Sequence, residues 1–251
     1  LLAGLLGVGG GIVIVPVLFF LFQHFGVSPE SAMAIATATS LATIIPTSIS
    51  SIRSHNSKGN VDFVLLKQWS WLILIGVVIG SLVVTKIEGT WLTLLFSIIA
   101  LLAALNMLFR AGKPAIFSSL PSEAGQGAIA TNIGFFSSMV GIGGGTLSVP
   151  ILTACNYPAH KAVGTAAAIG LLISLPGALI MLLFGTTPAD APVLTFGLVN
   201  LIGFVCIVPL TVLFAPVGAA LAQKLNPTRL KQVFAIALLI TGVRMFIQVA
   251  L

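Results

Sequence analysis

The feature that most constrains this chain is a glycine-proline motif written twice inside apolar sequence. The first copy, G-V-G-G-G-I-V-I-V-P-V-L, covers residues 7–18, and the second, G-I-G-G-G-T-L-S-V-P-I-L, covers residues 141–152. Glycine costs about 1 kcal/mol relative to alanine inside a helix, so four glycines within five residues predict a break in each apolar run. Backbone groups freed at membrane depth survive only where protein or a wet cavity surrounds them. Two such breaks, one in each half, are typical of a transporter site.

The composition predicts a membrane protein. Hydrophobic residues make up 58% of the 251 residues, charged residues only 6%, and the mean hydropathy is +1.18. The apolar runs are too long for strands of alternating polarity, so they predict α-helices. The sequence begins at Leu1 inside an apolar run, and we expect the true N-terminus to lie upstream. The net charge of +6 comes from cations scattered over links, which favours membrane orientation over nucleic-acid binding.

The chain divides into two matching halves. We expect repeat one at 1–110, a connecting loop at 111–123 and repeat two at 124–251. Each half has a glycine-broken run followed by three spans, predicted at 31–52, 63–85 and 90–109, and then at 161–184, 197–223 and 228–250. The tetrapeptide G-x-V-(D/N) occurs at 59–62 and again at 197–200. An A-x-x-T patch ends at Thr37 in the first half and at Thr165 in the second.

Loop charges favour an inverted arrangement of the halves. If each glycine-broken run crosses the membrane fully, the halves lie parallel and the loop cations divide five against five. If each run dips in and returns, the halves are inverted, and only Lys86 lies opposite the other nine. Those nine are Arg53, Lys58, Lys67, Arg110, Lys113, Lys161, Lys224, Arg229 and Lys231. The positive-inside rule favours the second count. The predicted fold is an all-α polytopic membrane protein of two inverted repeats, each a re-entrant helix pair plus three transmembrane helices.

The motif glycines precede stretches that can form helices, so their N–H groups are expected to face a shared cavity. Free N–H groups and the positive end of a helix dipole suit an anion. The predicted binding residues are Gly9, Gly10, Gly11, Gly143, Gly144 and Gly145, with hydroxyls from Thr37, Ser40 and Thr165. Structural roles are predicted for Gly7, Pro16, Gly141, Pro150, Pro46 and Pro176. The alternative is that the glycines only allow helices to pack closely.

Enzyme chemistry finds no support in the sequence. The chain contains no H-E-x-x-H, G-x-S-x-G or P-loop motif and no paired carboxylates inside a span. Cys155 and Cys206 have no metal-ligand spacing, and we expect neither a metal nor another cofactor. Proton or Na⁺ coupling through a buried carboxylate lacks an obvious carrier.

These motifs resemble the sulfite exporter TauE/SafE family over essentially the whole chain. The resemblance implies export of a small sulfur oxyanion or organosulfonate, such as sulfite or sulfoacetate, by a multi-pass protein of the cytoplasmic membrane. It implies a small anionic substrate and the lipid bilayer as partners, and no nucleic acid. An anion channel with the same site and a membrane scaffold subunit remain alternatives. The substrate, the coupling ion, the direction and the oligomeric state stay open, with a homodimer as one alternative. Ala167 and Ala168 replace Thr39 and Ser40 in the second half, which predicts an asymmetric site.

Overall fold

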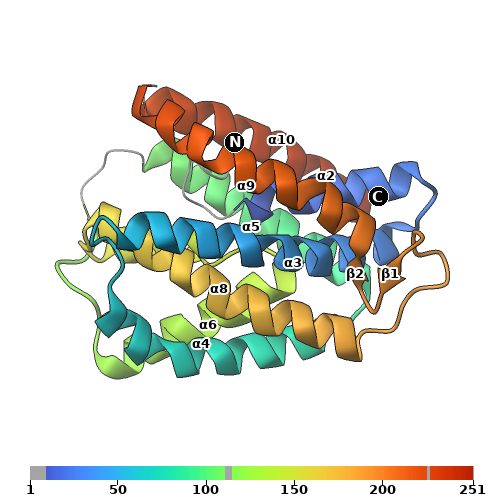
Figure 1. The fold of residues 1–251 in the computed structure, drawn as a ribbon, viewed down its shortest axis with the longest axis horizontal. Helices are drawn as coiled ribbons and strands as arrows, with labels where there is room; N and C mark the ends of the chain where they lie inside the picture. Colours follow the sequence, from blue (N-terminus) through green and yellow to red (C-terminus); the bar gives the residue numbers. More distant parts are fainter. Residues whose placement is uncertain (1–9, 111–114, 225–226, 251) are drawn as a thin grey trace.

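Long α-helices make up the bundle shown in Figure 1. The computed structural model describes residues 10–110, 115–224 and 227–250. The helices are α2 (Gly11–His24), α3 (Pro29–Asn56), α4 (Phe63–Val84), α5 (Gly89–Phe109), α6 (Glu123–Val140), α7 (Gly145–Ala154), α8 (Ala159–Phe184), α9 (Leu201–Lys224) and α10 (Pro227–Ala250). Two short strands, β1 (Thr195–Phe196) and β2 (Val199–Asn200), pair antiparallel before α9.

Helix length and composition confirm an all-α membrane protein with several spans. Five stretches of the described chain are long and apolar enough to cross a membrane, namely 29–56, 63–84, 89–109, 159–184 and 232–249. The remaining predicted span, 197–223, corresponds to α9, whose described side chains give a shorter apolar stretch at 201–214. Helix α7 has ten residues, so it is about 15 Å long, roughly half of a hydrocarbon layer of ~30 Å.

The second glycine motif interrupts the chain as the sequence predicts. Helix α6 ends at Gly141, which has φ 70°, and α7 begins at Gly145. At the far end of α7, Ile116 and Phe117 each donate an N–H to the Ala154 carbonyl at 2.9 Å. The end of α7 therefore lies beside the segment that leads into α6. In the first motif, α2 begins at Gly11, after Gly10 with φ 77°.

The bundle has two distinct ends, which we call the basic end and the hairpin end. The basic end contains the α3–α4 link, and the hairpin end contains the β1–β2 hairpin. At the basic end, the Asp62 N–H donates to Thr165 Oγ1 at 3.0 Å, which joins the α3–α4 link to the start of α8. At the hairpin end, the Ser28 N–H donates to Asp190 Oδ2 at 2.8 Å, near the β1–β2 hairpin that follows α8. Figure 1 shows the α3–α4 link at the left of the bundle and the β1–β2 hairpin at the right.

The two G-x-V-(D/N) tetrapeptides have the same local structure. Gly59 and Gly197 both have positive φ, at 67° and 55°. The Asp62 carboxylate accepts from the first N–H groups of α4, and Asn200 Oδ1 accepts from the Gly203 N–H in α9. In both cases the side chain of the fourth residue caps the helix that follows. This likeness agrees with an internal repeat, whose boundaries remain a prediction.

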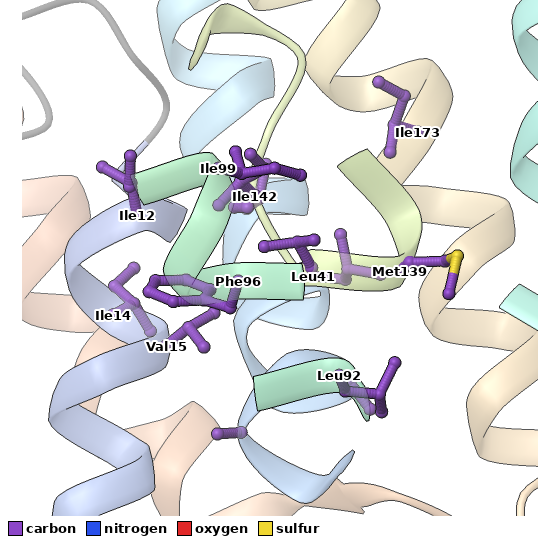
Figure 2. Close-up of a cluster of buried hydrophobic side chains, with 14 of the residues drawn as sticks. Ile12, Ile14, Val15, Leu41, Leu92, Phe96, Ile99, Met139, Ile142 and Ile173 are labelled. Carbon is purple, nitrogen blue, oxygen red and sulfur yellow. The ribbon is translucent and has the colours of Figure 1, made fainter. Parts of the chain in front are cut away.

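The hydrophobic core gathers around the point where the two motifs meet. Figure 2 shows buried side chains from α2, α3, α5, α6 and α8 in one cluster. Ile12 and Val15 come from the first motif, and Ile142 lies within the second motif. All three are at most 1% exposed. The segments that carry the candidate site are therefore held in the interior of the bundle.

Candidate functional site

The turn between α6 and α7 lies inside the protein. Residues 141–146 are all buried. The turn is tight at its start, because the N–H groups of Gly141 and Ile142 both point to the Ser137 carbonyl. Between Ile142 and the start of α7, no described backbone N–H donates a hydrogen bond to another backbone carbonyl. The positive end of the α7 dipole thus faces the interior rather than solvent.

The first motif contacts this turn directly. A Cβ added to Gly11 would lie 2.7 Å from the Gly141 carbonyl oxygen and 2.9 Å from Ile142 Cα. Only glycine permits such an approach of two backbones. The structure therefore brings Gly11 against Gly141 and Ile142 of the second motif. Gly7 and Gly9 lie outside the described residues.

Helix α3 supplies the hydroxyls nearest the turn. Ser40 Oγ donates to the Gly141 carbonyl at 2.7 Å. A Cβ on Gly141 would lie 2.7 Å from Thr37 Cα, so Thr37 is adjacent to the same residue. Thr37 Oγ1 is buried and has no hydrogen-bond partner within the described chain. Ser40 thus holds the turn in place, while the hydroxyl of Thr37 is free to bind something else.

Helix α8 closes the other side of the turn. A Cβ on Gly144 would lie 2.4 Å from Ile169 Cγ2 and 3.1 Å from the Gly170 nitrogen. Thr165, the predicted counterpart of Thr37, lies one turn before Ile169, but its hydroxyl accepts from the Asp62 N–H. The structure therefore places Thr165 in the contact between α8 and the α3–α4 link.

Several polar groups around the turn lack partners. Over the ranges that the structure describes, no hydrogen bond satisfies the N–H groups of Gly143, Gly144 and Gly145. The same holds for the buried hydroxyls of Ser137 and Thr146, which flank the turn on α6 and α7. Native proteins pair almost all buried polar groups, so such a cluster needs an explanation. The sequence interpretation missed Ser137 and Thr146, although both stand within four residues of the motif glycines.

The predicted structural prolines all lie inside helices. Pro16 is in α2, Pro46 in α3, Pro150 in α7 and Pro176 in α8. A proline in a helix leaves the carbonyl four residues earlier without its usual partner. Each of the four helices that surround the turn therefore has one interrupted position.

The segments that form the site carry no ionisable side chain. Stretches 10–22, 31–52, 137–148 and 162–184 contain no Lys, Arg, His, Asp or Glu. Within the described residues there is also no group of three or more His, Cys, Asp and Glu that could hold a metal. An anion at this turn would be bound by neutral donors and the α7 dipole alone.

Carboxylates join segments of the two halves at opposite ends. At the basic end the Tyr157 hydroxyl donates to Asp62 Oδ2, and this bond holds the pKa of Asp62 below its ordinary value. Burial, with Asp62 alongside, raises the pKa of Tyr157. At the hairpin end, hydrogen bonds from Ser28 and Ser31 lower the pKa of Asp190 to about 2.

Comparison with known proteins identifies a family and several relatives. A family model described as "Sulfite exporter TauE/SafE" matches residues 1–245. A "Probable membrane transporter protein" of Haemophilus influenzae is 30% identical over 249 residues, which is 98% of this chain and 94% of the relative. Probable membrane transporter proteins of Methanocaldococcus jannaschii and Bacillus subtilis are each 28% identical, covering 98% and 95% of this chain and 91% and 90% of the relatives. No solved structure gives a significant match.

Proposed function

Because the chain belongs to the sulfite exporter TauE/SafE family, we propose that it is a secondary transporter that exports a small sulfur oxyanion or organosulfonate across the cytoplasmic membrane. Sulfite and sulfoacetate are the substrates we favour. The observation that carries this proposal is the cluster of unpaired N–H and hydroxyl groups where the two glycine motifs meet. The proposed ligands are the N–H groups of Gly143, Gly144 and Gly145 and the hydroxyl of Thr37.

The chemistry of these groups suits a transported anion. Backbone N–H groups at a helix N-terminus bind sulfonate or sulfite oxygens without bringing a positive charge of their own. A site without a fixed cation binds the anion loosely enough to release it again, which transport requires. Thr146 and Ser137 add two further hydroxyls beside the turn.

The arrangement of the bundle suits alternating access. We propose that the halves are inverted and that both glycine motifs are tips of re-entrant segments. Among the described residues, Arg53, Lys58 and Lys161 lie near the basic end, whereas Lys86 follows α4 at the other. The positive-inside rule then places the basic end in the cytoplasm. Movement of one half against the other would expose the tips first to one side and then to the other.

A substitution of Thr37 tests the site. Thr37→Val keeps the shape of the side chain and removes a hydroxyl that has no partner, so the protein should fold at least as stably as the wild type. Sulfite should then stabilise it less against heat and exchange more slowly in counterflow with labelled sulfite in proteoliposomes. Gly144→Ala is less informative, because its Cβ would lie 2.4 Å from Ile169 Cγ2 and disturb packing.

Thr43→Val is the matched control. Thr43 Oγ1 donates to the Ser40 carbonyl of its own helix at 2.7 Å, so its loss affects no proposed ligand. If Thr37→Val and Thr43→Val respond to sulfite alike, the proposed site is wrong. Counterflow also separates the rivals, because an anion channel shows no exchange stimulated from the far side, and a scaffold subunit shows neither exchange nor stabilisation.

A further inference from the structure

The Cβ direction of Gly170 in α8 points towards two polar atoms. A Cβ placed on Gly170 would lie 3.0 Å from Ser48 Oγ and 3.8 Å from the Gly144 nitrogen. Apart from residues 169–171 and the nearby backbone of α8, no other heavy atom of the described chain lies within 4 Å of that point. The contrast with Gly144 and Gly11 is clear, because a Cβ on either would meet three atoms at 3.1 Å or less.

Both polar atoms lack a partner. Ser48 lies on α3 and is only 5% exposed, and its hydroxyl forms no hydrogen bond within the ranges the structure describes. The Gly144 N–H is one of the unpaired groups of the α6–α7 turn. Two donors from different segments on the same side of α8 can share one oxygen atom held between them. Gly170 has no side chain that would reach into this space.

We propose that Ser48, Gly144 and the bare backbone of Gly170 form a subsite for one oxygen of the bound sulfite or sulfonate group. This inference rests on the proposed function and extends it to two residues, Ser48 and Gly170. The second half has Ala167 and Ala168 where the first has hydroxyl residues. Ser48 of α3 supplies a hydroxyl to the turn of the second half and so makes up for this difference.

Alanine at position 170 tests the subsite directly. The methyl group of Gly170→Ala would point towards Ser48 Oγ and the Gly144 N–H and crowd an oxygen held between them, while its closest neighbour is Ser48 Oγ, a side-chain end that can rotate. The protein should therefore fold, and the sulfite concentration for half-maximal counterflow should rise about tenfold or more, as expected for the loss of a hydrogen bond to a charged group.

Gly177→Ala is the matched control on the same helix. Its Cβ would also have a closest contact of 3.0 Å, to Leu41 Cδ1, but it lies away from the free N–H groups of the turn. Its half-maximal sulfite concentration should stay at the wild-type value. Ser48→Ala should weaken sulfite binding as Gly170→Ala does. Ser97→Ala should not, because Ser97 only bonds the Thr93 carbonyl of its own helix.

The outcomes separate the two proposals. The subsite is supported if the wild type exchanges labelled sulfite and only Gly170→Ala and Ser48→Ala bind sulfite more weakly. Wild-type exchange with Gly170→Ala equal to Gly177→Ala overturns the subsite and leaves the transporter proposal standing. If the wild type neither exchanges sulfite or sulfoacetate nor gains thermal stability from either, the proposed function itself is wrong. Thermal stability without ligand shows whether each variant is folded.

Discussion

Gly141 must meet two demands that no other residue type can meet. Its φ of 70° lies in the left-handed region, which costs roughly 1–2 kcal/mol for a residue with a side chain. A Cβ there would also lie 2.7 Å from Thr37 Cα and 2.8 Å from the Thr37 carbonyl oxygen. Backbone atoms of a packed helix cannot move aside as the end of a side chain can. The position of Thr37 relative to the turn therefore depends on this glycine.

A pair of glycine substitutions separates the two demands. Gly141→Ala should lower the unfolding temperature in detergent strongly, since it adds a backbone clash to the strain of positive φ. Gly26→Ala shares the strain, with φ 86°, but would meet nothing within 4 Å, and should be destabilised by only about 1–2 kcal/mol. Equal losses in the two variants would show that the contact with Thr37 contributes nothing to stability.

At the scale of single residues, the sequence predicted where a side chain lies better than which group it bonds. The matched threonines suggested symmetric roles, and the structure places Thr37 beside Gly141 but pairs Thr165 with the Asp62 N–H. The corresponding N–H of Asn200 donates to Thr39 at 2.9 Å, two residues beyond Thr37. A shift of two residues on a helix moves a hydroxyl to another face. Internal similarity of sequence does not reveal such a shift, because the partner lies in the other half.

At the scale of elements, glycine and proline signals located most breaks, and polar links located the helix ends. Predicted spans at 63–85 and 90–109 correspond to α4 (Phe63–Val84) and α5 (Gly89–Phe109). The expected start at 197 was wrong by four residues, because Gly197 turns the β1–β2 hairpin and Asn200 caps α9. A two-residue strand pair has too little periodicity to be seen in a sequence.

The contact at the hairpin end predicts a dependence of stability on pH. The pKa of Asp190 is lowered to about 2 from an ordinary value of 3.8, so its hydrogen bonds with Ser28 and Ser31 contribute stability above about pH 4. That contribution disappears as the pH falls towards 2. Asp190→Asn should therefore unfold at a lower temperature than the wild type at pH 7.

The difference between Asp190→Asn and the wild type should shrink between pH 4 and pH 2.5, as the wild-type carboxylate takes up its proton. We expect a small effect, because the carboxylate is largely exposed to solvent. Unfolding temperatures measured across this range check the prediction. A difference that stays constant over the range would show that the charge of Asp190 does not stabilise the contact.

At the scale of the whole molecule, orientation in the membrane can be measured with single cysteines. Lys58 and Lys86 are exposed in links, and Lys161 is exposed in the first turn of α8. In a background with Cys155 and Cys206 replaced by alanine, Lys86→Cys should react with an impermeant maleimide on intact cells. Lys58→Cys and Lys161→Cys should react only after permeabilisation. Labelling of Lys58→Cys and Lys161→Cys from opposite sides would indicate parallel halves and contradict the inverted arrangement.

The shortness of α7 has an electrical consequence. With ten residues it rises about 15 Å from its end near Ile116, so in the proposed orientation its first residues lie near the middle of a layer of ~30 Å. A monovalent ion resting there has crossed about half of the transmembrane voltage, which amounts to ~1 kcal/mol for every 100 mV. The membrane potential would therefore set how often an anion from either side of the membrane reaches this depth. The voltage alone could drive the transported anion out of the cell.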